Sequence, residues 1–394
     1  MDSDTLLARI TDYANRPNPY PLYAELRGAG PVVRQTDGSC LVGTYHEIAA
    51  LLHDPRMSVA PRSRGEVTHK PPFLRLDDPE HHRLRTLAMR PFGPLHSPGR
   101  VDAMRGEIDQ ITKELMEPFE AGRQIDVVDD FAYPLPVTVI CRLLGVPRED
   151  EPLFRAWSDA LVAAADVRPE ADTTETDKAG DQARIEMGGY LVNLAEQRRG
   201  NPSDDMLSAF ANEPDPALRL TQEELAETAV LLLIAGHETT VNLITNGVLT
   251  FLRHPEHLDH LRRDPDLLPR AVEELLRYEP PVHMRERIPR ADIDVVGTTI
   301  PEDTSVVLVL ASGNRDPMRF HEPDRFDPTR PDNQHLGFGS GIHLCCGAPL
   351  ARIEARAALG ALIPHLGTAR LVEDPPPYRQ NAMLRGPRHL PIQL

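Results

Sequence analysis

The sequence predicts a mainly α-helical protein with smaller β-sheets, an α+β fold, and three observations support this prediction. Good helix formers recur at helical spacing along most of the chain, and the longest run extends from Thr221 to Arg253. Alternation typical of strands is confined to short stretches, most clearly residues 293–311. No internal repeat or low-complexity linker divides the 394 residues, so we expect one domain spanning residues 1–394.

Composition narrows the class of protein. Hydrophobic residues make up 40% of the chain and charged residues 26%, as in soluble globular proteins. The 43 basic and 60 acidic residues give a net charge of −17, which argues against general nucleic-acid binding. We expect no signal peptide and no membrane span, because no uninterrupted apolar stretch reaches about 18 residues. The four cysteines suggest no disulfide framework, so a cytoplasmic location is expected.

The first third of the chain is predicted to contain short helices, a hairpin and one long loop. Helices are expected over residues 22–26 and 45–54, and Asp37-Gly38 is a favoured turn dipeptide for a hairpin over residues 32–42. Residues 57–72 form a loop long enough to suggest a function. In the helix that begins after Leu76, His81 and Arg85 share a face, which is either an ordinary solvated surface or a pair of donors for an acidic ligand.

The middle of the chain is predicted to be helical. Helices are expected over residues 101–121, 137–144, 151–165 and 182–199, and the acidic, aperiodic residues 167–177 form either a lid or an exposed connector. The longest helix then begins with capping-box spacing at Thr221. Its apolar centre is interrupted by polar residues from His237 to Thr240, and Gly236 with Thr239 predicts a bulge or kink. Buried polar groups are costly unless used, so we interpret this interruption as functional.

The last third combines a helix, strands and an irregular segment. Residues 268–278 are predicted to be helical, with Glu274 and Arg277 spaced for an ion pair. Residues 293–311 predict two or three strands, and residues 314–330 a meander rich in Pro, Asp and Arg. A helix over residues 350–366 and short strands close the chain.

A glycine-rich turn precedes that last helix and ends in a cysteine. Gly339 and Gly341 permit a tight backbone, and Cys345 stands just ahead of the helix start. The helix dipole and free backbone N–H groups there favour a thiolate. A lone cysteine is more commonly a small buried apolar residue, but the frame Phe-x-x-Gly-x-x-x-Cys-x-Gly from Phe338 to Gly347 is specific.

Four separated stretches resemble the cytochrome P-450 family in order and spacing: Ala235–Thr240, Glu274–Arg277, Pro323–Phe326 and Phe338–Gly347. His81-x-x-x-Arg85 and Asn314–Pro317 are also similar to soluble bacterial members. The resemblance covers essentially the whole chain. It implies the cytochrome P-450 fold, with the long central helix over a haem.

Roles follow from this resemblance. Cys345 would be the axial thiolate ligand of the iron, with Cys346 as a spectator. The residues expected to bind the cofactor are His81, Arg85, Ala235, Gly236, Arg287, Phe338, Gly339, His343 and Gly347. Four of these, namely His81, Arg85, Arg287 and His343, would bind the haem propionates. Glu238 and Thr239 are the predicted catalytic residues, an acid–alcohol pair that relays protons. Glu274, Arg277 and Arg325 resemble a structural ion-pair triad.

The implied activity is that of a haem-thiolate monooxygenase. It would use heme b (iron protoporphyrin IX) and O2 to hydroxylate or epoxidise a mid-sized, mostly apolar organic molecule such as a secondary metabolite. Electrons originating from NAD(P)H would arrive through ferredoxin and ferredoxin reductase, docking on the Cys345 side near Arg100, Arg352 and Arg356. Substrate contacts are expected from residues 57–72, 160–185, 233–240 and 282–284 and from the turn near Met383.

Three alternatives remain open at this stage. The same haem chemistry could serve oxidative coupling, dehydrogenation or bond cleavage. A non-catalytic haem or gas-binding protein would leave Glu238 and Thr239 without a purpose. A zinc site built on His343, Cys345 and Cys346 lacks a fourth ligand and the usual spacing between thiols. His237 faces either the pocket or a neighbouring helix.

Overall fold

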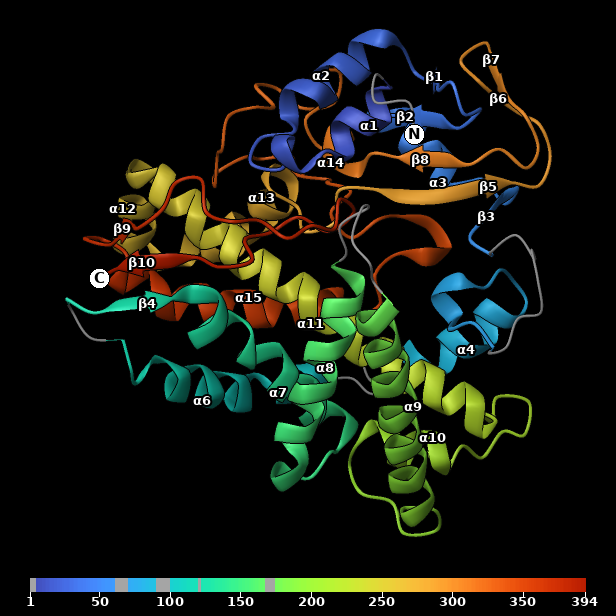
Figure 1. Cartoon of the computed structure of the whole chain (residues 1–394). Coiled ribbons are helices and arrows are strands. Elements are labelled where there is room, and N and C mark those ends of the chain that lie inside the picture. The colour runs from blue at the N-terminus through green and yellow to red at the C-terminus, as the bar shows by residue number, and fades with distance from the viewer. Residues whose placement is uncertain (1–4, 61–69, 90–99, 120–121, 167–173) are drawn as a thin grey trace.

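The computed structural model describes residues 5–60, 70–89, 100–119, 122–166 and 174–394. Helices form the lower and left parts of the molecule in Figure 1, and most strands gather at the upper right. The helix α11 (Gln222–Arg253) passes between these parts and contacts α7, α8, α9, α13 and α15. The predicted combination of many helices with smaller sheets is confirmed.

The remaining elements have the following bounds. The other α-helices are α1 Leu6–Thr11, α2 Tyr20–Ala29, α3 Tyr45–His53, α4 Glu80–Met89, α5 Arg100–Ala103, α6 Arg105–Met116, α7 Pro134–Leu144, α8 Glu151–Ala165, α9 Thr174–Gln197, α10 Met206–Ala211, α12 Pro255–Arg263, α13 Leu268–Tyr278, α14 Leu310–Gly313 and α15 Ala348–Leu362. The strands are β1 Val33–Arg34, β2 Cys40–Val42, β3 Met57–Ser58, β4 Gln124–Asp126, β5 Arg285–Pro289, β6 Ile293–Val295, β7 Thr298–Ile300, β8 Val306–Leu308, β9 Arg370–Leu371 and β10 Pro391–Gln393. Short helical turns include η3 Val128–Ala132 and η6 Gly341–His343.

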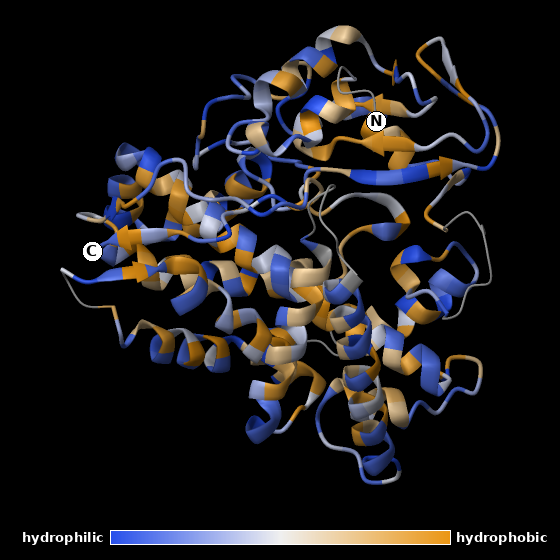
Figure 2. Cartoon of the chain, in the orientation of Figure 1, coloured by the Kyte–Doolittle hydropathy of each residue, from blue (hydrophilic) through white to orange (hydrophobic). Residues whose placement is uncertain are grey.

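The larger sheet has the order β1-β2-β8-β5-β3. The strands β2 and β8 pair in parallel, and the other neighbouring strands of this sheet pair antiparallel. The predicted hairpin is confirmed, with Val33 opposite Leu41. Strand β5 was not predicted, because its first residues are Arg285, Glu286 and Arg287, and this strand is visibly hydrophilic in Figure 2. Backbone pairing with β8 on one side and β3 on the other stabilises β5 as a strand, although its side chains do not favour one.

The helix α11 begins where the capping box predicts. The Thr221 hydroxyl accepts the N–H of Glu224 at 3.2 Å, and the Glu224 carboxylate accepts the N–H of Thr221 at 3.0 Å. The helix continues without a π or 3-10 segment to Arg253, so the predicted bulge is wrong. In the part of the chain that the structure describes, α11 is the one helix long and apolar enough to cross a membrane. Since 72% of its most apolar window is buried inside the protein, it is a core helix.

The predicted ion pair lies at the centre of the meander. Glu274 and Arg277 are both fully buried, 2.7 Å apart, and Arg277 also donates to the carbonyl oxygens of Asn314 and Pro323. The third member is not Arg325, whose side chain is 59% exposed and bonded to Glu322. It is Arg330, whose Nε lies 3.2 Å from the Glu274 carboxylate. The irregular segment is therefore held by one buried carboxylate and two arginines.

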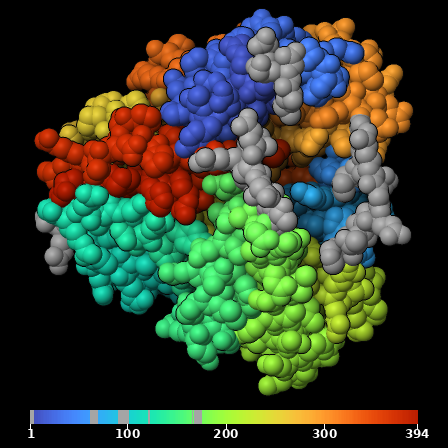
Figure 3. Space-filling model, viewed as in Figure 1, coloured from blue at the N-terminus to red at the C-terminus, as the bar shows by residue number. Residues whose placement is uncertain are grey.

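A segment near the N-terminus contacts a segment near the C-terminal end of the chain. Tyr13 donates its hydroxyl to the carbonyl of Tyr378 at 3.0 Å, and Arg16 donates to the carbonyl of Gln380 at 3.1 Å. Figure 3 shows the same meeting as a boundary between dark blue N-terminal and red C-terminal surfaces. The N-terminal segment therefore supports the hairpin around residues 378–387, which bridges Tyr378 to Pro387.

Candidate active site

The cysteine loop is shaped by two glycines in the left-handed region. Gly339 has φ +70° and Gly341 has φ +69°, values that side chains other than glycine rarely adopt. A Cβ on Gly341 would stand 2.2 Å from the carbonyl oxygen of Leu52, so α3 closes on this turn. The N–H of Cys345 donates to the carbonyl of Phe338 at 3.0 Å, which closes the loop just before α15. The predicted tight turn is confirmed.

Cys345 is accessible, whereas Cys346 is partly buried against the apolar core. Burial nevertheless raises the pKa of the Cys345 thiol, and it outweighs the backbone N–H of Gly347 and the charges of Arg85 and Arg285, which lower it. The backbone N–H groups at the start of α15 thus lower the pKa of Cys345, as expected from the sequence, but burial has the larger effect. Burial and the neighbouring thiol raise the pKa of Cys346 to about 11. A coordinating metal would be needed to deprotonate Cys345 fully.

Helix α4 places two predicted donors beside this loop. The ring centroids of His81 and His343 are 4.2 Å apart, and the guanidinium of Arg85 donates to the carbonyl of Leu344. His81 is only 2% exposed and its Nδ1 lies 3.1 Å from Asp78, so α4 does not present it to solvent. Among the described residues, Nε2 of His81 and Nδ1 of His343 are buried without a hydrogen-bond partner. Such nitrogens need a hydrogen-bonding partner that the described residues do not supply.

The fourth predicted donor comes from the sheet. Arg287 on β5 is 9% exposed, and burial followed by the charge of Arg285 lowers its pKa to about 10. Burial, followed by the charges of His81, Arg287 and Arg85, lowers the pKa of His343 to about 4. The structure therefore brings all four predicted donors together from α4, β5 and the cysteine loop.

Helix α11 turns one accessible side toward the same region. Ala235 is exposed and Gly236 and Thr239 are partly exposed, although the residues around them are buried. Leu231, one turn earlier, packs against the apolar cluster of Phe73, Leu84 and Ala88, as does Cys346. The cysteine loop and α11 therefore meet at one apolar cluster. Thr239 donates its hydroxyl to the carbonyl of Ala235 at 2.7 Å, a bond that threonine can form within a helix without a bulge.

Comparison with known proteins gives the family. The family model described as Cytochrome P-450 matches residues 50–393. The chain is 42% identical over 392 residues to cytochrome P-450 monooxygenase PikC of Streptomyces venezuelae, covering 95% of this chain and 91% of that protein. It is 37% identical to 6-deoxyerythronolide B hydroxylase of Saccharopolyspora erythraea, covering 95% and 96%.

The chain belongs to the cytochrome P-450 family.

A solved structure agrees with this cytochrome P-450 assignment. P450BioI in complex with an acyl carrier protein ligated to hexadec-9Z-enoic acid superimposes with a TM-score of 0.86. It is 36% identical in sequence and covers 97% of this chain and 99% of its own. The protein is thus a haem-thiolate monooxygenase, and as in the family it uses haem, O2 and NAD(P)H-derived electrons supplied by redox partners. The predicted fold, enzyme class and cofactors are confirmed.

The residues of this site fit a haem. A planar macrocycle with two carboxylates needs an accessible ligand on one face, small residues on the other, and cationic donors at its edge. Cys345 supplies the first, Ala235 and Gly236 the second. The ring nitrogens of His81 and His343 that lack a hydrogen-bond partner supply hydrogen-bonding groups for the edge of the macrocycle.

The polar residues beside Thr239 have separate environments. The ring of His237 packs edge-on against Tyr133, with centroids 4.2 Å apart, so His237 faces the neighbouring helix α7. Burial, followed by the charge of Arg379, lowers its pKa to about 3. Glu238 is buried, which raises its pKa, and its carboxylate lies 3.7 Å from Nε of Arg379. Tyr133 and Arg379 were not predicted, because no local motif marks them.

The expected substrate-contacting segments are only partly within the described residues. Residues 61–69 and 167–173, which belong to the predicted loop and lid, lie outside them. Val282 forms an isolated β-bridge with Leu384, and the N–H of His283 donates to the carbonyl of Met383 at 2.9 Å. The predicted segments 282–284 and the turn near Met383 are therefore neighbours.

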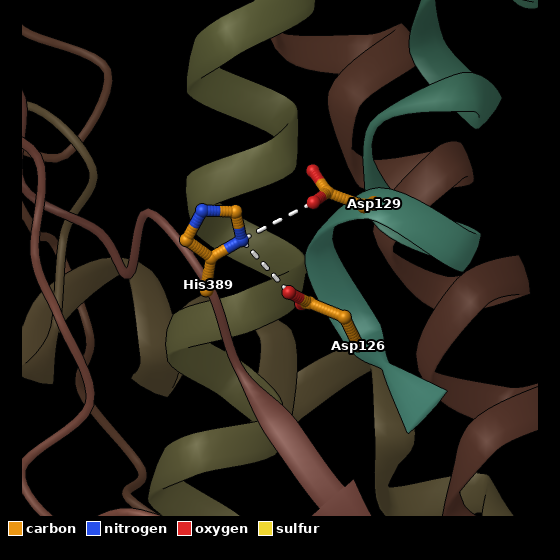
Figure 4. A group of neighbouring side chains, drawn as sticks. All are labelled: Asp126, Asp129 and His389. Carbon is orange, nitrogen blue, oxygen red and sulfur yellow. Dashed lines mark hydrogen bonds and ion pairs between the residues drawn. The ribbon is translucent and has the colours of Figure 1, made fainter. Parts of the chain in front are cut away.

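A second group of titratable side chains lies away from the cysteine loop, at β4 and β10. Figure 4 shows Asp126, Asp129 and His389 pointing toward one another. Nδ1 of His389 lies 2.9 Å from Asp126 and 3.1 Å from Asp129. The same nitrogen, Nδ1 of His389, faces both carboxylates and can share one N–H between them. We interpret this group as a surface interaction between His389 and the two aspartates.

Proposed function

We propose that Cys345 is the axial ligand of the haem and that this protein inserts one oxygen atom into a mid-sized, mostly apolar organic substrate by hydroxylation or epoxidation. The observation that carries the proposal is the accessible Cys345 in a glycine-shaped loop, with the orphaned ring nitrogens of His81 and His343 beside it. Relatives named 6-deoxyerythronolide B hydroxylase and polyketide biosynthesis cytochrome P450 PksS support the substrate class.

Each group of residues has a distinct task in this proposal. The haem, when bound, supplies the activation of O2 and the insertion of oxygen. Arg85 and Arg287 would hold its propionates through charge-assisted hydrogen bonds, and His81 and His343 would bind them through their unpartnered ring nitrogens. Among the glycines of the loop, Gly347 is the one whose Cβ would lie beside Sγ of Cys345, at 4.0 Å.

Proton delivery is assigned to Thr239 and Glu238. The Thr239 hydroxyl donates to the carbonyl of Ala235, so its oxygen remains free to accept a hydrogen bond from water. Burial raises the pKa of Glu238, which favours the protonated form of its carboxyl group. Glu238 therefore acts as a proton donor through water. Thr239 Oγ1 orients the water molecule that donates to it toward the accessible side of α11.

We infer that a ferredoxin with its reductase is the electron donor, and that the protein acts in the cytoplasm. Arg352, expected in the docking patch, forms a bidentate ion pair with Glu273 at 2.7 and 2.8 Å, so its charge is largely neutralised. Arg356 is partly exposed, and Nε has no hydrogen-bond partner among the described residues. Arg356 therefore contributes more to the patch than Arg352 does.

The absorbance of the reduced, CO-bound protein tests the assignment of Cys345. We expect a red-shifted Soret band in the wild type and its loss in Cys345→Ser, because a serine oxygen is a poorer donor to iron. Cys346→Ser is the matched control and should retain the band. Reduction by NADPH, ferredoxin and ferredoxin reductase in place of dithionite should develop the same band.

Two results would contradict the proposal. A band at the position of histidine-ligated haem in the wild type would exclude thiolate ligation. Loss of the band in Cys346→Ser but not in Cys345→Ser would exchange the roles of the two cysteines. Mass spectrometry of the product would then show whether an oxygen atom is added or only hydrogen is lost.

A further inference from the structure

The hairpin formed by residues 378–387 carries an arginine that is buried without a hydrogen-bond partner. Arg379 is 1% exposed, and among the described residues none accepts a hydrogen bond from its Nε, Nη1 or Nη2. Buried polar atoms are almost always paired, and an unpaired buried charge is especially costly. An arginine in this state needs a partner from outside the protein.

Two other buried arginines among the described residues, Arg277 and Arg385, have every guanidinium nitrogen bonded. Arg277 uses its three guanidinium nitrogens to bond Glu274 and three backbone carbonyls. Arg385, in the same hairpin, bonds the carbonyls of Arg16 and Pro17 and the carboxylate of Glu279. For these two structural arginines, the protein itself supplies the hydrogen-bond acceptors. Arg379 is thus an exception within its own segment.

The nearest carboxylate does not neutralise Arg379. Nε lies 3.7 Å from Glu238 Oε1, beyond hydrogen-bond distance. Burial raises the pKa of Glu238, which favours its uncharged form. His237, which also feels the charge of Arg379, is neutral because burial lowers its pKa to about 3. The guanidinium is therefore a cation without a full counter-ion.

The position of Arg379 points to the substrate rather than to the haem. Glu238 directly precedes Thr239, and Asn242, one turn later, packs against Gly386 with both amide atoms unpartnered among the described residues. The same hairpin is joined to residues 282–284 at Leu384. The propionate donors, by contrast, come from α4, β5 and the cysteine loop. Arg379 thus belongs to the hairpin expected to border the substrate, and its guanidinium faces the centre of α11.

We propose that Arg379 is a substrate-recognition residue and that the substrate carries a carboxylate on an otherwise apolar body. This inference rests on the proposed monooxygenase function. A guanidinium presents parallel N–H groups that match the two oxygens of a carboxylate, and burial strengthens that pairing. The carboxylate would supply the missing counter-ion, and the apolar body would extend toward the accessible side of α11 at Ala235 and Thr239.

Binding of matched acids and esters tests the proposal. The probes are octanoic, dodecanoic and hexadecanoic acid and a steroid acid, each with its methyl ester, and the holoenzyme is titrated by calorimetry and by the Soret shift. The wild type is expected to bind at least one acid about tenfold or more tighter than its ester. Arg379→Gln should remove this preference and change ester affinity by less than about twofold. Arg388→Gln, which alters a half-exposed arginine of the same segment, should keep the preference.

Several results would overturn the proposal. One is a wild type that shows no acid preference in any pair, as expected if water or the chain itself satisfies Arg379. Another is an Arg379→Gln variant that retains the preference. If Arg379→Gln does not fold, Arg379→Lys decides: a preference reduced severalfold supports the proposal, and an unchanged one contradicts it. The CO-bound spectrum of each variant reports thiolate ligation separately, so failure of the monooxygenase assignment is distinguishable from failure of this inference.

Discussion

The polar side chains at the centre of α11 differ in what surrounds them. His237 packs against Tyr133 and is neutral, and Glu238 is buried beside Arg379. Thr239 is the member of this run that reaches the accessible side, one turn after Ala235. Proton transfer is therefore assigned to the Thr239 hydroxyl and the adjacent Glu238 carboxyl group, although the sequence shows four adjacent polar residues.

Replacing Thr239 tests this assignment. Thr239→Ala is expected to lower product formation about 100-fold while O2 consumption continues, because positioned proton transfer contributes about 10²–10⁴-fold. The measurement is product formed per NADPH, with hydrogen peroxide release determined in parallel. Thr245→Ala is the matched control, since Thr245 back-bonds to Val241 at 2.9 Å in the same helix but is fully buried. Unchanged coupling in Thr239→Ala would remove Thr239 from the proton path.

At the scale of elements, the meander depends on a single buried carboxylate of α13. Glu274 accepts from Arg277, from Arg330, and from the N–H of Asp327 at 2.9 Å. These bonds connect α13 to the segment that leads directly into the cysteine loop. Irregular backbone of this length would otherwise be free to move, so the buried network positions Cys345 indirectly.

Two arginines of the meander should therefore differ in their effect on stability. Arg330→Ala is expected to lower the free energy of unfolding by about 2–4 kcal/mol, because Glu274 loses one partner in a buried site. Arg325→Ala should change it by less than about 0.5 kcal/mol, since that side chain is exposed and bonded only at the surface. Thermal unfolding of both variants with haem bound measures the difference. Equal losses would restore the sequence-based choice of Arg325.

At the scale of the whole molecule, strongly patterned segments could be predicted from the sequence and segments defined by contacts could not. The helices α8 and α13 have their predicted bounds, because proline and apolar spacing mark them locally. Strand β5 was missed, since its pairing with β8 and β3 overrides a polar sequence. Cys345 and His343 could be named from a local motif, but Arg379 acquires its role from α11, which is distant in the sequence. The choice between Arg325 and Arg330 likewise depends on which side chain turns inward.

Stability of the whole fold should also depend on one carboxyl group at its centre. Glu354 in α15 is 3% exposed, and burial alone raises its pKa from 4.5 to about 8. Between these values the folded protein binds a proton that the unfolded chain does not, so the stability contributed by this group falls as pH rises. The slope is at most about 1.4 kcal/mol per pH unit, and it vanishes below the unfolded pKa and above the folded pKa.

Glu354→Gln removes this titration while keeping the shape of the side chain. Relative to the wild type, the variant is expected to gain stability progressively as pH rises from 4.5 toward about 8, because its amide cannot ionise. Thermal midpoints of both holoproteins across this range measure the difference. Glu373→Gln, at an exposed position, should show no such trend. A pH-independent difference for Glu354→Gln would mean that Glu354 does not change its protonation on folding, and that a partner in the core holds its charge.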